Sequence, residues 1–146
     1  MEFINGGELY YHLTQVGRFC EDRAKFYAAE IILTIQYLHE KGVIYRDLKP
    51  ENILLDSEGH IKLTDFGLSK EGIDKTGGLT ESFCGTTEYL APEMLKENKY
   101  GFSVDWYSLG LVIFEMLSGY NPFKTIDSSY EEKTERILTY EIQIPS

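Results

Sequence analysis

The chain has 146 residues, of which 42% are hydrophobic and 14% aromatic, and this composition is typical of one folded domain rather than a disordered segment. Its formal net charge of −10 argues against a nucleic-acid partner, because such binding depends on clustered lysine and arginine. The two cysteines lie far apart, no apolar run is long enough to cross a bilayer, and no secretory signal is visible. We therefore expect an intracellular, cytoplasmic protein with no direct membrane segment.

The first elements expected in chain order are an extended segment, a glycine pair and a helix-like stretch. A longer helix is predicted over 21–41, where apolar residues recur every three to four positions. Acidic residues at its start suit the helix dipole, and Gly42 suits the position just beyond its end. His39 is interpreted as a core or capping histidine rather than a ligand. The apolar positions of this helix are Ala24, Ala28, Ile31, Ile32, Ile35 and Leu38.

A polar loop is expected next, in the run Tyr45-Arg46-Asp47-Leu48-Lys49-Pro50-Glu51-Asn52 between two short apolar segments. The proline excludes a regular helix or a central strand there. The segments 53–55 and 61–63 flank a turn that contains acidic residues, serine and glycine, which predicts a hairpin of two short strands. Such a hairpin fixes the distance between Asn52, before its first strand, and Asp65, after its second.

The residue types around this hairpin suggest phosphate chemistry. Asn52 and Asp65, the latter expected to be buried, offer the hard oxygen ligands that magnesium prefers, together with phosphate and water. Lys49 offers a point charge for a phosphoryl group. The alternative is a solvated surface loop followed by an ordinary turn at Asp65-Phe66-Gly67. Both motifs in this order, next to strand-like segments, favour the catalytic interpretation.

The second half of the chain alternates a loop with helices. Residues 71–81 are rich in glycine, threonine and charge and predict a flexible loop. Residues 103–117 are apolar nearly all round and predict a helix inside the core, capped by Ser103 and with Asp105 in its first turn. Ser129 and Glu132 form a capping-box pattern before a further helix.

The motifs together resemble those of protein kinases. Tyr45 to Asn52 resembles the catalytic loop, Asp65-Phe66-Gly67 the magnesium-binding motif, and Ala91-Pro92-Glu93 the end of the activation segment. Tyr45 and the run Phe83-Cys84-Gly85-Thr86 are similar to the AGC group of serine/threonine kinases, above all its cyclic-AMP-dependent and Akt-like members. The resemblance implies a mainly α fold with short β-hairpins. Residues 1–146 would form a partial kinase domain, most of the C-terminal lobe, from the lobe linker to the helix after the core helix.

The resemblance implies a reaction, namely transfer of the γ-phosphoryl group of ATP to a serine or threonine hydroxyl, with Mg²⁺ as cofactor. Asp47 would orient the hydroxyl and accept its proton, and Lys49 would neutralise charge on the moving group. Asn52 and Asp65 would hold the metal. Thr86 would hydrogen-bond Asp47 and Lys49 and favour hydroxyl substrates.

The resemblance also implies binding residues for the nucleotide and for the protein substrate. Leu54 and Thr64 could equally be plain core residues. Three acidic positions match those that bind basic residues in relatives, so we predict arginine or lysine at the third residue before the acceptor. The nucleotide set is Glu2, Ile4, Glu8, Glu51, Leu54 and Thr64, and the substrate set is Glu8, Glu51 and Glu115.

Ser82 stands where AGC kinases carry their activating phosphate, which an upstream kinase would add. The phosphate would pair with Arg46 and Lys70. The alternative is an ordinary loop serine, but the match of Ser82-Phe83-Cys84-Gly85-Thr86 favours the regulatory site, and Thr80 and Thr86 are further candidates for modification. Thr87 stands where proline is usual in this group, a departure that affects the detail of the substrate pocket.

Two structural residues follow from the same template. Asp105 would accept backbone hydrogen bonds from the catalytic loop, and Glu93 usually pairs with an arginine of a later helix that this sequence does not contain. The glycine-rich loop and the strand lysine of kinases are also outside this sequence, so we expect the chain alone to be inactive. The alternatives are a truncated kinase lobe that acts as a binding module, and a nucleotide- or metal-binding module of another fold, which the lack of a P-loop pattern disfavours.

Overall fold

The computed structural model describes residues 5–73, 80, 84–96, 99–124 and 128–143 of the chain. The elements are mainly helical, with one antiparallel hairpin among the described residues, which confirms the predicted fold class. The α-helices are α1 (Leu9–Val16), α2 (Glu21–Glu40), α3 (Pro92–Leu95), α4 (Ser103–Ser118) and α5 (Tyr130–Thr139). The strands are β1 (Ile53–Leu55) and β2 (Ile61–Leu63), and the 3₁₀ turns are η1 (Pro50–Asn52), η2 (Phe66–Leu68) and η3 (Thr87–Tyr89).

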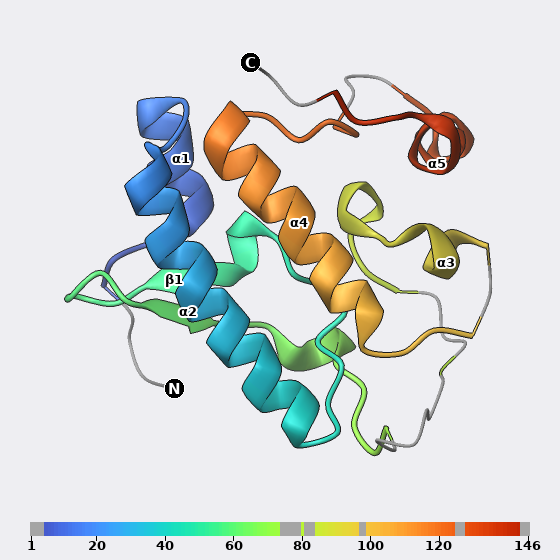
Figure 1. Cartoon of the computed structure of the whole chain (residues 1–146), viewed down its shortest axis with the longest axis horizontal. Coiled ribbons are helices and arrows are strands. Elements are labelled where there is room, and N and C mark those ends of the chain that lie inside the picture. Colours follow the sequence, from blue (N-terminus) through green and yellow to red (C-terminus); the bar gives the residue numbers. More distant parts are fainter. Residues whose placement is uncertain (1–4, 74–79, 81–83, 97–98, 125–127, 144–146) are drawn as a thin grey trace.

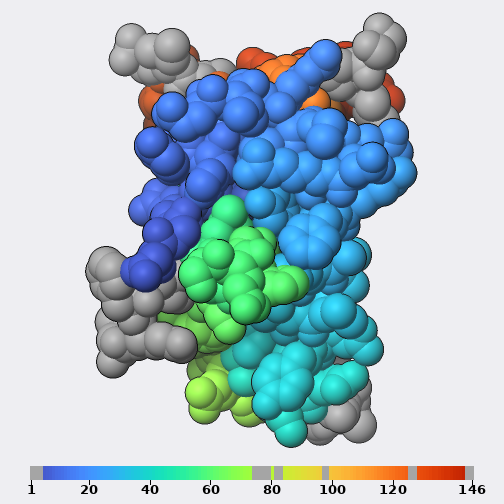
Figure 2. All heavy atoms as spheres, turned by 90° about the vertical axis from the view of Figure 1, so that its left-hand side faces the viewer, coloured from blue at the N-terminus to red at the C-terminus, as the bar shows by residue number. Residues whose placement is uncertain are grey.

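Helices α2 and α4 lie side by side at the centre of the molecule, α1 lies near the upper ends of both, and α5 lies on the other side of α4, against η3 and α3 (Figure 1). The hairpin lies against α1 and α2, and its turn is exposed on the face shown in Figure 2. Helices α1 and α2 thus support the hairpin, α1 through β1 and α2 through β2.

Helix α2 begins and ends as the sequence predicts. Glu21 and Asp22 occupy its first turn, where negative charge is favourable. At the other end, Gly42 has a φ of 74°, and the N–H groups of Gly42 and Val43 bond the carbonyls of His39 and Leu38, both at 3.0 Å. This Schellman pattern requires the left-handed conformation that glycine adopts without strain.

The predicted hairpin of two short strands is present. Ile53 pairs with Leu63 and Leu55 with Ile61, and the Asp56 carboxylate accepts bonds from two backbone N–H groups of the turn. The N-terminal segment adds to β1, because Gly6 N–H donates to the Leu55 carbonyl at 2.9 Å. A Cβ on Gly6 would lie 2.3 Å from that carbonyl oxygen, so only glycine fits this close approach.

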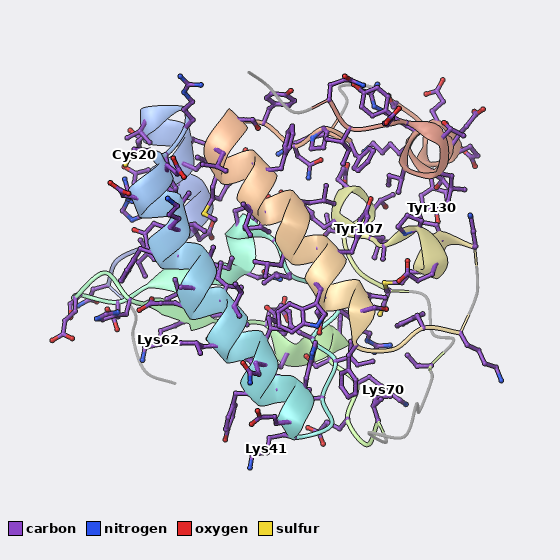
Figure 3. The ribbon with its side chains drawn as sticks, in the orientation of Figure 1. Cys20, Lys41, Lys62, Lys70, Tyr107 and Tyr130 are labelled. Atoms are coloured by element: carbon purple, nitrogen blue, oxygen red, sulfur yellow. The ribbon has the colours of Figure 1, made fainter. Side chains whose placement is uncertain are left out.

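The buried apolar side chains form two clusters. The larger one lies between α1, α2, α4 and the hairpin, and the smaller one lies around Met94 of α3 and Val104 of α4. Tyr107 of α4 packs on the smaller cluster and lies between α4 and α3 (Figure 3). The segment after Val43 connects the two clusters, because Ile44 belongs to the smaller one, whereas Tyr45 and Leu48 belong to the larger.

Some packing predictions are wrong. Ile32 of α2 is 40% exposed and so lies off the buried face, and α4 is not enclosed all round, since Trp106 is 40% exposed. Ser103 does not cap α4: Phe102 is the residue before the helix, and the Ser103 hydroxyl instead donates to Glu93 at 3.3 Å. The capping box at Ser129 and Glu132 is confirmed. Of the predicted loop over 71–81, residues 74–79 and 81 lie outside the described residues.

Candidate active site

The segment Tyr45–Asp47 is anchored through its backbone by Asp105 of α4, which is fully buried. Its carboxylate accepts hydrogen bonds from the backbone N–H of Tyr45 at 2.9 Å and of Arg46 at 2.8 Å. The His39 ring of α2 contributes a third bond at 2.7 Å. Arg46 is held with a φ of 70°, a left-handed conformation that is unfavourable for a residue with a side chain. The buried carboxylate stabilises this turn, which sends Asp47 toward the hairpin.

Asp47 is the centre of a dense polar network and is only 5% exposed. One carboxylate oxygen accepts from the Thr86 N–H at 3.2 Å and from the Thr86 hydroxyl at 3.0 Å. The other accepts from the Asn52 side-chain amide at 2.9 Å and lies 3.1 Å from Lys49 Nζ. Lys49 also donates to the Thr86 hydroxyl at 2.6 Å. The expected contacts of Thr86 with Asp47 and Lys49 are therefore present, and the catalytic roles of all four residues stay a prediction.

The Asn52 side chain is oriented by two bonds from its amide nitrogen, to the Asp47 carboxylate and to the Asp47 carbonyl, both at 2.9 Å. These bonds use the amide N–H groups and leave the amide oxygen for another ligand. On the other strand, Thr64 N–H donates to the Asn52 carbonyl at 3.0 Å, so the ladder continues past Ile53 and Leu63 toward Asp65. The hairpin thus places Asn52 and Asp65 at the same end, as the sequence predicts.

Asp65 is exposed, which contradicts the prediction of a buried acid. It has a φ of 55°, and its carboxylate accepts a bond from Gly67 N–H at 3.2 Å. This bond caps η2 and leaves the second carboxylate oxygen with no partner among the described residues. An amide oxygen from Asn52 and a carboxylate oxygen from Asp65 are hard ligands, so this pair fits a magnesium ion that keeps phosphate and water as its remaining ligands.

Of the expected nucleotide-binding residues, Glu2 and Ile4 lie outside the described residues. Glu8 is exposed and forms an isolated β-bridge with Leu54, so the structure brings these two residues together. Thr64 is half-buried, its hydroxyl donates to the Asn52 carbonyl at 3.2 Å, and its own carbonyl accepts a bond from the Tyr45 hydroxyl. Thr64 therefore connects the segment that contains Tyr45 to the hairpin.

Burial and neighbouring negative charge raise the pKa of two tyrosines near the site, Tyr45 and Tyr89. Burial, reinforced by the charges of Asp47 and Asp65, strongly raises the pKa of Tyr45. Burial and the charge of Glu115 likewise raise the pKa of Tyr89. Both hydroxyls therefore remain protonated at neutral pH and act as hydrogen-bond donors, to the Thr64 carbonyl and to the Glu115 carboxylate.

The expected substrate carboxylates differ in their surroundings. Glu115 of α4 is 3% exposed and accepts from the Tyr89 hydroxyl at 2.5 Å. Burial raises the pKa of Glu115, and the charge of Glu51 raises it further. One carboxylate oxygen of Glu51 is buried and accepts no hydrogen bond from the described residues. Such a carboxylate is costly to leave unpaired, and a cationic ligand would satisfy it.

The expected phosphate site is only partly described, because Ser82 lies outside the described residues. Arg46 is buried and engaged, since its guanidinium donates to the Leu68 carbonyl at 2.6 Å and to the Tyr100 hydroxyl at 3.1 Å. Lys70 is exposed on the segment that pairs with Ile44 (Figure 3). Glu93 is half-buried and accepts the bond from Ser103, so it is not the unpaired carboxylate expected from the sequence.

Comparison with known proteins agrees with this geometry. The family model described as the protein kinase domain matches residues 1–145. The chain belongs to the protein kinase domain family. The kinase chain is 54% identical over 145 residues to the RAC-beta serine/threonine-protein kinase of Mus musculus and 53% identical to that of Homo sapiens. It is also 53% identical to the RAC-beta serine/threonine-protein kinase A of Xenopus laevis.

These relatives confirm the resemblance to AGC-group serine/threonine kinases. The alignments cover 99% of this kinase chain but only 30% of the mouse and human relatives. None of the helices within the described ranges has the length and apolar character needed to cross a membrane.

Sequence reasoning missed two partners of the site. His39 was interpreted as a core or capping residue, yet it bonds Asp105 across the interface of α2 and α4. Tyr89, in the segment after Thr86, belongs to no motif that indicates this role, although its hydroxyl donates to Glu115. Neither partner is signalled by local spacing, because each bond joins residues far apart in the chain.

Proposed function

We propose that this chain forms the C-terminal-lobe part of the active site of a serine/threonine protein kinase. In the whole protein this site would transfer the γ-phosphoryl group of ATP to a serine or threonine hydroxyl. The observation that carries the proposal is the set of donors around Asp47. A hydroxyl, that of Thr86, already donates to this carboxylate at 3.0 Å, which supports its ability to orient a substrate hydroxyl in the same way.

In this mechanism the Asp47 carboxylate accepts the proton of the substrate hydroxyl as the oxygen attacks the γ-phosphorus. Lys49, 3.1 Å from Asp47, neutralises negative charge on the transferring group. Asn52 and Asp65 are the residues that would hold magnesium, which when bound neutralises charge on the ATP phosphates. Catalysis of this kind depends mainly on positioning, and the bonds from Asp105 to the catalytic loop supply rigidity.

The proposed substrates are proteins with a basic residue at the third position before the acceptor. Support comes from the unpaired, buried oxygen of Glu51 and from the exposed Glu8, which offer negative charge near the site. A peptide array on the full-length protein would test this, and indifference to arginine at that position would exclude the preference. An upstream kinase acting at Ser82 and a cytoplasmic location complete the proposal.

The central experiment compares Asp47→Asn with the parental full-length protein, measuring phosphate transfer from ATP to serine and threonine peptides. Removal of the general base is expected to lower kcat by about 10²–10⁴-fold. Asp22→Asn is the matched control, because Asp22 is an exposed acid in the first turn of α2, and its kcat should equal the parental value. Equal kcat values for Asp47→Asn and the parent would exclude Asp47 as the catalytic base.

A second candidate function is the alternative left by the sequence, a truncated kinase lobe that binds partners without chemistry. Immunoblotting of source-cell lysate with an antibody to this region separates the two. A native protein near 16.8 kDa would support the binding module, whereas a clearly larger protein would support the kinase.

A further inference from the structure

A cavity of about 400 Å³ lies between α1 and the C-terminal end of α4, and Glu115 is part of its lining. Its lining includes Tyr10 and Thr14 of α1, Glu115 of α4, and Asn121 and Lys124 from the loop that follows α4. The cavity therefore contains one carboxylate proposed to bind substrate and one lysine of the chain itself. No kinase motif in this sequence includes that lysine.

Lys124 is held over α1 by Tyr10. Its ammonium nitrogen donates to the Tyr10 hydroxyl at 3.4 Å and lies 4.9 Å from the centroid of the Tyr10 ring. A cation over an aromatic face is stabilised there, which favours this position over the other rotamers of an exposed lysine. Asn121 is fixed beside it, since its side-chain oxygen accepts from Phe123 N–H at 2.8 Å, which shapes the turn that leads to Lys124.

The electrostatic environment of Lys124 is acidic. Partial burial opposes its charge, but the Tyr10 hydroxyl and the carboxylates of Glu51 and Glu115 outweigh it and raise the pKa of Lys124. Lys124 therefore remains cationic at neutral pH. Neither carboxylate lies within 4 Å of the ammonium group, so within the described residues Lys124 compensates their charge without forming a direct ion pair.

Lys133, in contrast to Lys124, forms a direct ion pair with a carboxylate. Lys133 of α5 lies 2.6 Å from a carboxylate oxygen of Glu88 in η3, so that carboxylate has a direct cationic partner. Glu51, in contrast, keeps a buried oxygen without a hydrogen-bond donor. Glu51 does not line the cavity, but its charge acts on both Glu115 and Lys124, so the cavity carries a resident cation in an acidic environment.

We propose that Lys124 is a specificity-determining residue that competes with a basic side chain of the substrate for the cavity lined by Glu115. Through this competition, the kinase would gain little from a second basic residue beyond the one proposed at the third position before the acceptor. This inference rests on the proposed protein kinase function.

The competition has a physical basis in like-charge repulsion. An arginine that enters the cavity meets both the carboxylate of Glu115 and the ammonium of Lys124, so attraction and repulsion largely cancel. Because Lys124 is exposed, solvent screens the repulsion, and its removal should raise the affinity for that arginine by about threefold to fivefold. The effect should decrease as salt is added.

The test uses the full-length protein and a serine peptide with one arginine at the third position before the acceptor. A second arginine is then placed at each other nearby position in turn. The variants are Lys124→Ala and Lys124→Arg. The matched control is Lys41→Ala, because Lys41 is also an exposed lysine over a tyrosine ring, 5.5 Å from the Tyr37 centroid, at the far end of α2 (Figure 3). Both kcat/KM and peptide affinity by fluorescence anisotropy are measured.

The expected result is a gain of about threefold to fivefold for Lys124→Ala at one position of the second arginine, through KM and not kcat. Lys124→Arg and Lys41→Ala should match the parent at every position. Equal affinities of Lys124→Ala and the parent for all peptides would overturn the inference, and so would an equal gain with the single-arginine peptide. Anisotropy decides this even if no phosphate is transferred, whereas absence of transfer by the parent would count against the proposed function alone.

Discussion

Replacement of Asp105 by asparagine tests whether the buried Asp105 carboxylate anchors the backbone of the proposed catalytic loop. Asparagine has the same shape but presents one oxygen and one NH₂ group, so it cannot accept from both Tyr45 and Arg46. At least one charge-assisted bond is lost and a buried N–H then faces another donor, which costs about 2–3 kcal/mol. Arg46 loses the contact that supports its left-handed backbone, a conformation that itself costs about 1–2 kcal/mol.

The assay is thermal unfolding of the full-length protein together with its phosphotransfer kinetics. A loss of about 2–3 kcal/mol corresponds to a fall in Tm of about 5–10 °C for a domain of typical kinase size. We expect kcat to fall more than the affinity for ATP, because the loop positions Asp47. His39→Gln is the comparison variant, since it removes only the third bond and should cost about 1 kcal/mol. A Tm within 1 °C of the parental value and an unchanged kcat for Asp105→Asn would refute the anchoring role.

Three further predictions concern the described residues. The hydrogen bond and charge of Glu30 raise the pKa of His60 above 6.5, so NMR titration should give a higher midpoint that returns toward 6.5 in Glu30→Gln. The stability gained from this pair is present below pH 6.5 and is lost as the pH rises through the raised pKa. Because burial raises the pKa of Glu115, its ionisation opposes folding as the pH rises above 4.5. Denaturant titrations should show that Glu115→Gln gains stability relative to the parent between acid and neutral pH, and a constant difference would contradict this. Gly119→Ala should lose about 1–2 kcal/mol in the same assay, because Gly119 has a φ of 87° and a Cβ there would lie 2.4 Å from the Gly17 carbonyl oxygen. Gly59→Ala is its control, because Gly59 has the same φ of 87° but open space around an added Cβ. Gly59→Ala should therefore lose less stability than Gly119→Ala.

The elements that sequence predicts well are those determined by local chemistry. Helix α2 was expected over 21–41 and is found at Glu21–Glu40, because both of its ends carry their own signals. The capping box of Ser129 and the hairpin turn between β1 and β2 are local in the same sense. The residues proposed for catalysis could be named for a related reason, since the motif around Asp47 spans only eight positions and Asp65 follows the hairpin directly.

Contacts between distant segments could not be predicted in this way. The apolar sequence of α4 does not reveal that Trp106 lies on an uncovered face, since burial depends on which element packs there. Ser103 is a good capping residue by type, but its hydroxyl finds Glu93 of α3, ten positions away, instead of its own helix. The bond from His39 to Asp105 spans 66 positions and depends on the packing of α2 on α4.

The connection of the two hydrophobic clusters by consecutive residues affects how the catalytic loop can open. Ile44 is buried in one cluster and Tyr45 in the other, and both are 0% exposed. A local fluctuation that exposes the amides of this loop must withdraw a side chain from at least one cluster, which links loop opening to disruption of a core. These amides should therefore exchange with deuterium on the timescale of cooperative unfolding, while those of the hairpin turn exchange through faster local motion.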